Sequence, residues 1–382
     1  MSSATKDTSN KLKELALLFF RLGVTAFGGP PAHIAMMHDE VVTRRKWLEE
    51  QEFLDLMGAT NLIPGPNSTQ MALHMGYSRA RWRGMIVSGS CFILPSAFLV
   101  LLLTWLYVQY GTTTYAETLF YGIKPVIIAI VLQALYMLGR KAVKDVLTSL
   151  VAVGVVAGYF YGINEILFIF LGGLVVMLLR NYKSIASSRM FSFVAPILGV
   201  NLVALQAKEV ALSTLFLTFF KIGAVLYGSG YVLLAFLEAD FVNALGWITT
   251  QQLIDVVAIG QVTPGPLLTT ATSIGYLVAG FKGAVLATVA IFLPSFIFVP
   301  FVNSVVPKLR NSPLAGAALD GVNAASLGLM GAVTIQLARV SLIDPLTIII
   351  AVLCAAALFF LRINSTWLIA GGGIIGILSG MI

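Results

Sequence analysis

Two basic residues, Arg21 and Lys221, occupy equivalent places in two apolar segments far apart in the chain. A cation inside such a segment is costly and is usually kept for a function. Two cations suit a small oxyanion, and a guanidinium can bind two of its oxygens at once. The alternative is that both side chains lie shallow and reach a lipid headgroup. Lys124 is a third candidate, with an interfacial anchor as its alternative.

Proline and glycine interrupt stretches of both copies. Gly28-Gly29-Pro30-Pro31 breaks the stretch 12–43, Pro64-Gly65-Pro66 breaks the stretch 50–79, and Pro264-Gly265-Pro266 breaks the equivalent of the latter in the second copy. Polar residues then open a new helix, whose free N–H groups and positive dipole end favour an anion. The alternative is that these prolines only kink spanning helices. The predicted substrate-binding residues are Arg21, Lys221, Lys124, Gly28, Gly29, Pro30, Pro64, Gly65, Pro66, Asn67, Ser68, Thr69, Gly228, Ser229, Pro264, Gly265, Pro266 and Thr269.

Carboxylates and a histidine near these breaks are candidates for proton coupling. A titratable group inside a membrane is a functional candidate by default. Asp55 and Asp255 could equally be helix-start or surface residues. The predicted proton-coupling residues are Asp55, Asp255, His33, Glu40 and Asp240.

Other chemistry is missing from the sequence. It contains neither a phosphate-binding loop for a nucleotide nor a metal-ligand spacing. Cys91 and Cys354 lie in separate apolar segments, where a disulfide is not expected. We therefore predict no enzyme activity and no cofactor, and a transport driven by ion gradients.

The composition places these residues in a membrane protein. Of 382 residues, 58% are hydrophobic and only 11% are charged, against about a quarter in soluble domains. The net charge of +7 comes from basic residues scattered between apolar runs. This distribution indicates that the basic residues set the orientation of the chain in the membrane and do not bind nucleic acid. Eight runs are predicted to cross the membrane: 84–108, 119–138, 146–160, 166–179, 284–302, 317–337, 346–361 and 367–382.

The chain contains an internal repeat. Phe20-Arg-Leu-Gly23 returns as Phe220-Lys-Ile-Gly223, and Pro64-Gly65-Pro66 returns as Pro264-Gly265-Pro266. Trp47, Asp55 and Gly84 also have partners in this register, at Trp247, Asp255 and Gly283. Chance similarity between apolar helices would match Leu and Val, so the repeat indicates two copies of one unit.

The basic residues predict how the two copies are oriented. In the first copy, the loops around 79–83, 140–144 and 180–189 are basic and the loops between them are not. Cytoplasmic loops are the basic ones, so 12–43 and 50–79 should each enter and leave on the cytoplasmic side. The second copy lacks most of these charges, which favours an inverted copy.

The predicted fold is therefore an all-α integral membrane protein of two inverted repeats. Each repeat has two re-entrant helical hairpins and several transmembrane helices. The boundaries are 1–190 for the first repeat, 191–210 for a connecting transmembrane segment and 211–382 for the second repeat. The N-terminus should be cytoplasmic and the C-terminus outside the inner membrane. Substrate would then bind where the hairpin tips converge at the midplane.

Two stretches of this sequence resemble the chromate ion transporter family. They are Phe20-Arg-Leu-Gly-Val-Thr-Ala-Phe-Gly-Gly-Pro-Pro-Ala-His-Ile-Ala35 and Asn61-Leu-Ile-Pro-Gly-Pro-Asn-Ser-Thr-Gln70, and the resemblance covers essentially the whole chain. It implies export of chromate that uses the proton gradient, and a substrate path through Arg21, Gly28, Gly29, Pro30, Pro64, Gly65, Pro66 and Asn67. The second copy departs from the pattern at Ser229-Gly230 and Leu267-Leu268.

Three functions remain open at this point. The first is a chromate/proton antiporter, which would confer chromate resistance. The second is a permease for sulfate or another oxyanion, and the third is an anion channel in which the hairpins form a static filter. The expected partners are chromate or sulfate, protons, membrane lipid and a second copy in a homodimer.

Overall fold

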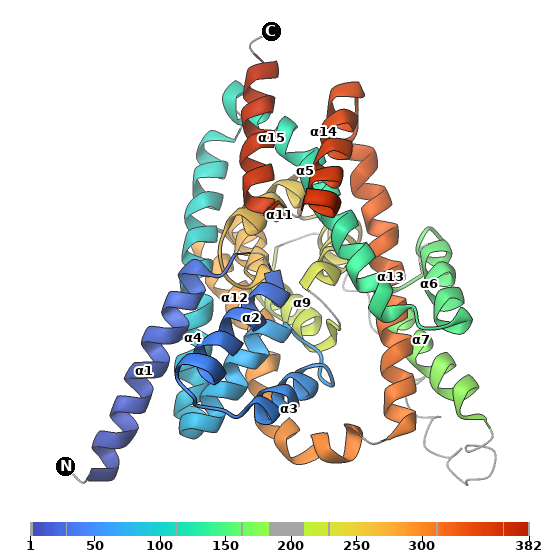
Figure 1. Cartoon of the computed structure of the whole chain (residues 1–382). Coiled ribbons are helices and arrows are strands. Elements are labelled where there is room, and N and C mark those ends of the chain that lie inside the picture. Colours follow the sequence, from blue (N-terminus) through green and yellow to red (C-terminus); the bar gives the residue numbers. More distant parts are fainter. Residues whose placement is uncertain are drawn as a thin grey trace.

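The protein is helical throughout the part that the computed structural model describes, which comprises residues 3–27, 29–111, 113–161, 163–182, 210–227, 230–310, 312–361 and 363–380 (Figure 1). No strand occurs in these ranges. The predicted all-α fold class is confirmed. The predicted connecting segment 191–210 lies outside the described residues, apart from its last residue.

The two copies share one order of elements. The first consists of α1 (Ser3–Thr25), α2 (Gly29–His38), the π-helical η1 (Asp39–Arg44), α3 (Glu50–Thr60), α4 (Asn67–Tyr110), α5 (Thr114–Ala142), α6 (Val146–Tyr159) and α7 (Glu165–Arg180). The second consists of α9 (Leu212–Val225), η4 (Gly230–Val232), α10 (Leu233–Leu237), the π-helical η5 (Glu238–Ala244), α11 (Thr250–Val262), η6 (Leu267–Thr269), α12 (Thr270–Arg310), α13 (Pro313–Ser341), α14 (Pro345–Ala356) with η7 (Ala357–Leu361), and α15 (Ser365–Ser379).

Helix α4 folds back on itself within its apparent length. Ser88 Oγ donates a hydrogen bond of 2.8 Å to the carbonyl of Ala72, 16 positions earlier. A continuous helix would separate these residues by about 24 Å. The reversal lies at Ala80 and Arg81, whose backbone is not helical. The chain therefore turns where the sequence predicts a basic loop before the 84–108 span.

Glycine makes this reversal possible. Gly76 and Gly84 face each other across the turn, and a Cβ on either would overlap the carbonyl oxygen of the other. The second copy repeats the device in α12, where the backbone leaves helical geometry at Ala279 and Gly280. There the two arms are joined by the hydroxyls of Thr272 and Thr288, 2.7 Å apart. We call 67–79 and 270–278 the short arms and the remainders the long arms.

Helix α3, the Pro-Gly-Pro tip and the short arm of α4 form a hairpin. The guanidinium of Arg79, at the end of the short arm, lies 4.0 Å over the ring of Trp47, which precedes α3. Arg79 also forms an ion pair with Glu14 of α1. Both open ends of the hairpin therefore lie at the same end of the molecule.

Equivalent helices of the two copies run antiparallel. Near the start of α5, the Tyr121 hydroxyl donates a hydrogen bond of 2.7 Å to Asp344, beyond the end of α13. Just beyond the end of α5, Lys144 Nζ lies 2.6 Å from Asp320, near the start of α13. In Figure 1, the first turn of α1 and the last turn of α15 accordingly lie at opposite ends of the molecule.

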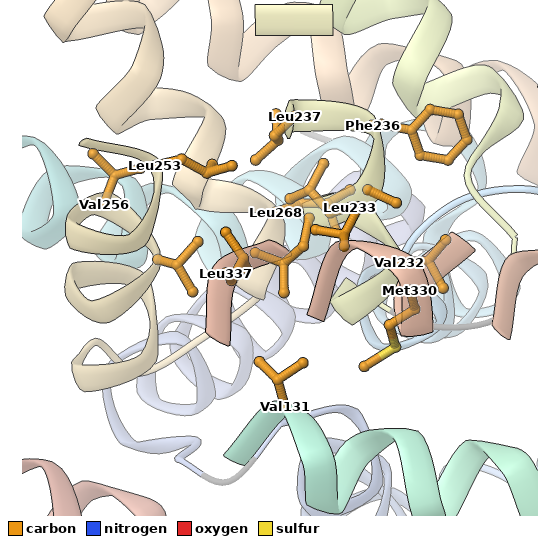
Figure 2. Packing of buried hydrophobic residues seen from close by; sticks show 14 of the residues in the cluster. Val131, Val232, Leu233, Phe236, Leu237, Leu253, Val256, Leu268, Met330 and Leu337 are labelled. Carbon is orange, nitrogen blue, oxygen red and sulfur yellow. The ribbon is translucent and has the colours of Figure 1, made fainter. Parts of the chain in front are cut away.

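The last helix of each copy packs against a long helix of the other copy. Helix α7 packs on α13 of the second copy, and α15 packs reciprocally on α5 of the first. Glycines allow both approaches, because a Cβ on Gly122 would overlap Gly372, and one on Gly321 would overlap Gly172. Figure 2 shows that the buried apolar cluster also crosses the interface, with Val131 of α5 opposite residues of η4, α10, α11 and α13.

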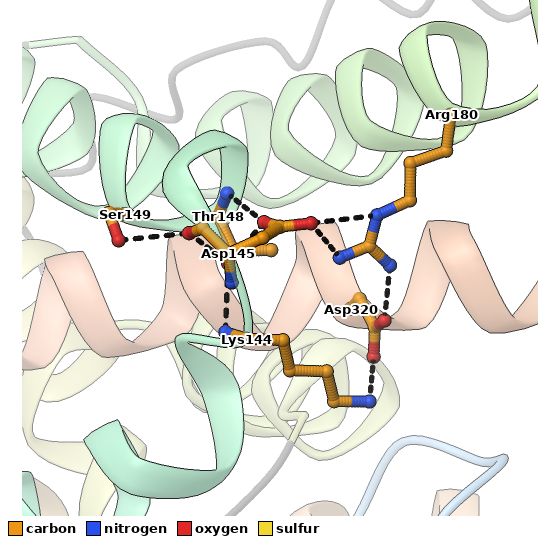
Figure 3. A network of polar contacts seen from close by, with 6 residues as sticks. All are labelled: Lys144, Asp145, Thr148, Ser149, Arg180 and Asp320. Carbon is orange, nitrogen blue, oxygen red and sulfur yellow. Dashed lines mark hydrogen bonds and ion pairs between the residues drawn. The ribbon is translucent and has the colours of Figure 1, made fainter.

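A polar network fixes one end of this interface (Figure 3). Arg180, at the end of α7, donates hydrogen bonds to Asp145 at 2.6 Å and to Asp320 of the second copy at 2.5 Å. The backbone and hydroxyl of Thr148, together with Arg180, lower the pKa of Asp145 to about 2. Asp145 therefore stays charged while it caps α6 and binds Arg180.

Four helices among the described residues are long and apolar enough to cross a membrane. They contain four of the predicted spans, namely 84–108, 119–138, 284–302 up to residue 301, and 317–337. The other four form shorter helices, and α6 with 14 residues is only about 21 Å long. Large apolar side chains on the outer faces, such as Phe98 and Phe281, are 65% exposed, as expected for a surface against lipid.

Candidate functional site

The hairpin tip of each copy is hydrogen-bonded to the residue that follows the first helix of the other copy. Gly65 N–H donates a hydrogen bond of 2.7 Å to the carbonyl of Leu226, which follows α9. Gly265 N–H donates one of 2.9 Å to Ala26, which follows α1. Both glycines have positive φ, 131° and 94°, which strongly favours glycine. Four chain breaks therefore meet in one region between the copies.

Serines from the long arms reach these tips. At the second tip, Ser96 Oγ and Thr269 Oγ1 are hydrogen-bonded at 2.9 Å. At the first tip, the equivalent Ser295 Oγ and Thr69 Oγ1 are buried without a hydrogen-bond partner. A buried hydroxyl without a partner is costly, so the first tip has unused hydrogen-bonding capacity that the second lacks.

A cavity of about 330 Å³ opens beside the first tip. Both copies contribute to its wall, since Asn61, Asn67 and Lys141 come from the first and Tyr227, Asn323 and Ser326 from the second. We call this space the open cavity. The rest of its lining is apolar apart from the backbone: Ile63, Leu138, Ala142, Val232 and Leu327.

The lining of the open cavity favours an anion. Helix α4 begins at Asn67, and no side chain caps its N-terminus. The N–H groups of its first turn carry the positive end of the helix dipole. Lys141 adds a full positive charge at the exposed mouth, and Ser326 Oγ is buried without a hydrogen-bond partner. The Asn67 side chain donates to Asn61 at 3.0 Å, which fixes its orientation.

The equivalent region of the second copy is closed. Gln261 and Leu267 stand there in place of Asn61 and Asn67, and the space beside the tip is about 20 Å³, room for about one water. Its helix starts as a tight turn, in which Thr269 Oγ1 donates to the carbonyl of Pro266 at 2.8 Å. The predicted residues Pro264, Gly265, Pro266 and Thr269 therefore belong to a closed tip, and of the four only Gly265 lines the small space beside it.

Arg21 and Lys221 are each bound by a carboxylate of their own copy. Arg21 lies 2.6 Å from Glu40, and Lys221 lies 2.5 Å from Asp240. Glu40 also accepts hydrogen bonds from Arg44 and Arg45 at 3.2 Å. Neither Arg21 nor Lys221 lines the open cavity. All four residues were predicted from the sequence as candidates, but their pairing was not. The base and its carboxylate are 19 residues apart in both copies.

Lys124 and Asp255 form an ion pair between the copies. Lys124 Nζ lies 3.3 Å from Asp255 Oδ1, and the Tyr107 hydroxyl donates a hydrogen bond of 2.8 Å to Asp255 Oδ2. The side chains of Lys124 and Asp255 are only 15% and 6% exposed. Asp55, the repeat partner of Asp255, is exposed and accepts a hydrogen bond from Gln51. The two aspartates therefore have different environments.

The remaining predicted residues lie as follows. Gly29, Pro30 and His33 lie beside the closed tip, where His33 Nε2 is 3.0 Å from the carbonyl of Ala26. Ser68 is buried one position after Asn67. Gly28, Gly228 and Ser229 lie outside the described residues. In the part of the chain that the structure describes, no three His, Cys, Asp or Glu residues gather as a metal site would need.

Several residues that line the open cavity were not predicted from the sequence. Asn323 was visible as the repeat partner of Lys124, and Asn61 stands in the motif before the Pro-Gly-Pro tip. Tyr227 was visible as the partner of Phe27. Nothing in the sequence distinguishes Lys141 from the basic residues beside it.

Comparison with known proteins supplies the remaining finding. A family model described as chromate transporter matches residues 13–177 and again residues 213–377. A chromate transport protein of Cupriavidus metallidurans is 33% identical over 96% of this chain and 93% of its own length. One of Pseudomonas aeruginosa is 30% identical over 95% and 91%. The transporter YwrA of Bacillus subtilis is 28% identical over 37% of this chain and 80% of its own length. No solved structure gives a significant match.

Proposed function

The chain belongs to the chromate transporter family, and we propose that it exports chromate across the inner membrane in exchange for protons. It is a multi-pass membrane protein, and the family is one of transporters, not enzymes. Relatives at 33% and 30% identity over most of the chain are named chromate transport proteins. Direction and proton coupling are parts of the proposal.

The open cavity is the main structural support for chromate binding. Chromate is a tetrahedral dianion whose oxygens only accept hydrogen bonds. The cavity offers donors and positive charge in the uncapped start of α4 and in Lys141. A Lys ammonium or a helix N-terminus strengthens a hydrogen bond to an anion. We place the oxyanion between Asn67, Lys141 and Asn323, which lie on the wall of one cavity.

The basic residues support a cytoplasmic opening for this cavity. Arg140, Lys141 and Lys144 cluster at the end of α5, at the end of the molecule that also holds Arg180. Cytoplasmic ends of membrane proteins carry the excess of Lys and Arg. We therefore retain as proposals a cytoplasmic N-terminus and an external C-terminus, with the hairpins of the first copy entering from the cytoplasm and those of the inverted second copy from outside. The proposed repeat boundaries stay 1–190 and 211–382, with 191–210 as the connection.

Alternating access follows from the two unequal halves. The copies are antiparallel, and the cavity is open beside one tip while its counterpart is closed beside the other. Inverted repeats commonly exchange such conformations during transport. In the proposed cycle, chromate enters the open cavity from the cytoplasm and leaves after the second tip opens outward.

The earlier assignment of Arg21 and Lys221 to substrate binding stays a prediction. Because each already binds a carboxylate, the present proposal does not use them as ligands. Among the proton-coupling candidates it uses Asp255, which is buried, and not Asp55, which is exposed.

Chromate binding to the purified protein tests this proposal. Lys141→Gln should weaken binding in titration calorimetry by about tenfold, since a hydrogen bond to a charged group contributes about 1.5–3 kcal/mol. The matched control is Arg140→Gln, which removes the neighbouring exposed charge outside the cavity wall. Equal weakening by both variants would mean that only the general field matters. Competition by sulfate, which has the same shape and charge, decides between the two oxyanions.

Transport into inside-out vesicles tests direction and coupling. Chromate accumulation should require an imposed proton gradient. Flux that follows voltage alone, with no response to the proton gradient, would instead indicate an anion channel.

A further inference from the structure

The ion pair of Lys124 and Asp255 lies away from the open cavity but is related to it by the repeat. Lys124 in α5 is equivalent to Asn323 in α13, which lines the open cavity. Asp255 lies on α11, the helix that leads to the closed second tip. Lys124 therefore stands in the second half at the position that Asn323 occupies on the wall of the open cavity, and Asp255 of the second hairpin is paired with it.

Opening of the second half must separate this pair. Tyr107 and Lys124 belong to the first copy, whereas Asp255 belongs to the hairpin of the second. If that hairpin moves away from α4 and α5, each buried charge loses its partner. A buried charge without a partner is strongly unfavourable, so each must gain a replacement.

The chemistry of the two groups determines the replacements. The Asp255 carboxylate becomes neutral if it takes up one proton. The Lys124 ammonium remains charged and needs an anion. We propose that Lys124 binds the oxyanion in the outward-open state, and that Asp255 takes up a proton when the pair opens and loses it when the pair re-forms. This inference rests on the proposed function and specifies its coupling.

Other charged groups do not compete at this position. Among the elements packed against α11, α15 carries no charged residue in its described range. Among the side chains that the structure describes, the charges of α4, α5, α12 and α13 other than Lys124 lie towards helix ends or turns: Arg79, Arg81, Arg83, Glu117, Arg140, Lys141, Lys282, Asp320 and Arg339. In η5, Glu238 is bound by Thr250, and Asp240 by Lys221. Lys124 and Tyr107 are the groups that contact the Asp255 carboxylate in the described residues.

Proteoliposomes containing the full chain test this inference with two assays of labelled chromate. The first measures exchange without a gradient, and the second measures transport driven by a pH gradient at clamped voltage. Asp255→Asn should retain exchange and lose the response to the pH gradient. Lys124→Gln should raise the KM at the outer face by about tenfold and leave the inner-face KM within about twofold of wild type. Asp55→Asn, the same change at the repeat partner, should behave as wild type.

Two further variants separate coupling from a structural role. Tyr107→Phe removes one hydrogen bond from the carboxylate and keeps the ring, so the pH profile of transport should move to higher pH. The double variant K124Q/D255N should fold but remain uncoupled. Gradient-driven transport by D255N or by the double variant would overturn the inference, as would an unchanged pH profile for Tyr107→Phe. Wild-type protein that transports no chromate would instead refute the proposed function itself.

Discussion

Replacement of Gly84 by alanine should destabilise the protein, although alanine favours helices. The fold-back of α4 brings Gly84 against the carbonyl oxygen of Gly76, and a Cβ there would overlap this backbone atom. Overpacking typically costs about 1–3 kcal/mol, and contact with backbone places this site near the upper value. The helix propensity of alanine returns about 1 kcal/mol. The net loss of unfolding free energy should be about 1–2 kcal/mol.

Thermal unfolding in detergent, followed by tryptophan fluorescence, measures this effect. At about 2.1 cal/mol/K of unfolding entropy per residue over 382 residues, the loss should lower the Tm by about 1–3 °C. The matched control is Gly58→Ala in α3, where a Cβ would have no neighbour within 4 Å. That variant should gain about 0.5–1 kcal/mol from helix propensity alone. If Gly84→Ala raises the Tm as Gly58→Ala does, α4 does not fold back at Ala80. The hairpin of α3, the Pro-Gly-Pro tip and the short arm of α4 would then not exist as described.

Three other predictions concern the interface and the cavity. Asp255→Leu should cost about 3–5 kcal/mol by leaving a buried ammonium alone, whereas the double variant K124M/D255L should recover most of the Tm; equal melting of both variants would refute the pairing. Because the pKa of Asp145 is lowered, its stabilising effect should be complete above about pH 4 and be lost as the pH falls through about 2. The Tm difference between wild type and Asp145→Asn should therefore be constant at neutral pH and shrink in acid, while a constant difference down to pH 2 would contradict this. Asn67→Leu, which copies the second tip, should weaken chromate binding about tenfold in calorimetry, and unchanged binding would move the site elsewhere.

The fold was largely predictable from the sequence because its signals are local. Apolar runs of membrane length set the long helices, and matched Gly and Pro residues set the breaks at Gly65 and Gly265. The reversal at Ala80 and Arg81 coincides with a run of basic residues that a membrane interior would not accommodate.

The candidate site was less predictable because it depends on contacts between distant residues. Lys124 and Asp255 were each found as isolated candidates, but their pairing requires α5 of one copy to lie against α11 of the other. The repeat also gave Asp55 and Asp255 equal weight. Only packing shows that one is exposed and the other buried, since the same local sequence meets different neighbours in each copy.

The difference between the open first tip and the closed second tip was only partly predictable from the sequence. Leu267 in place of Asn67 indicates a weaker anion site at the second tip. The sequence does not show that the second tip is closed, because closure depends on how the copies pack.

The position of chromium in a structure soaked with chromate would show whether the oxyanion binds in the open cavity. Anomalous scattering at the chromium absorption edge locates the metal without assumptions about its ligands. We expect a chromium peak in the open cavity, close enough for the chromate oxygens to accept hydrogen bonds from the α4 N-terminus and Lys141. A peak beside Arg21 or Lys221, with Glu40 or Asp240 displaced, and none in the cavity would contradict it.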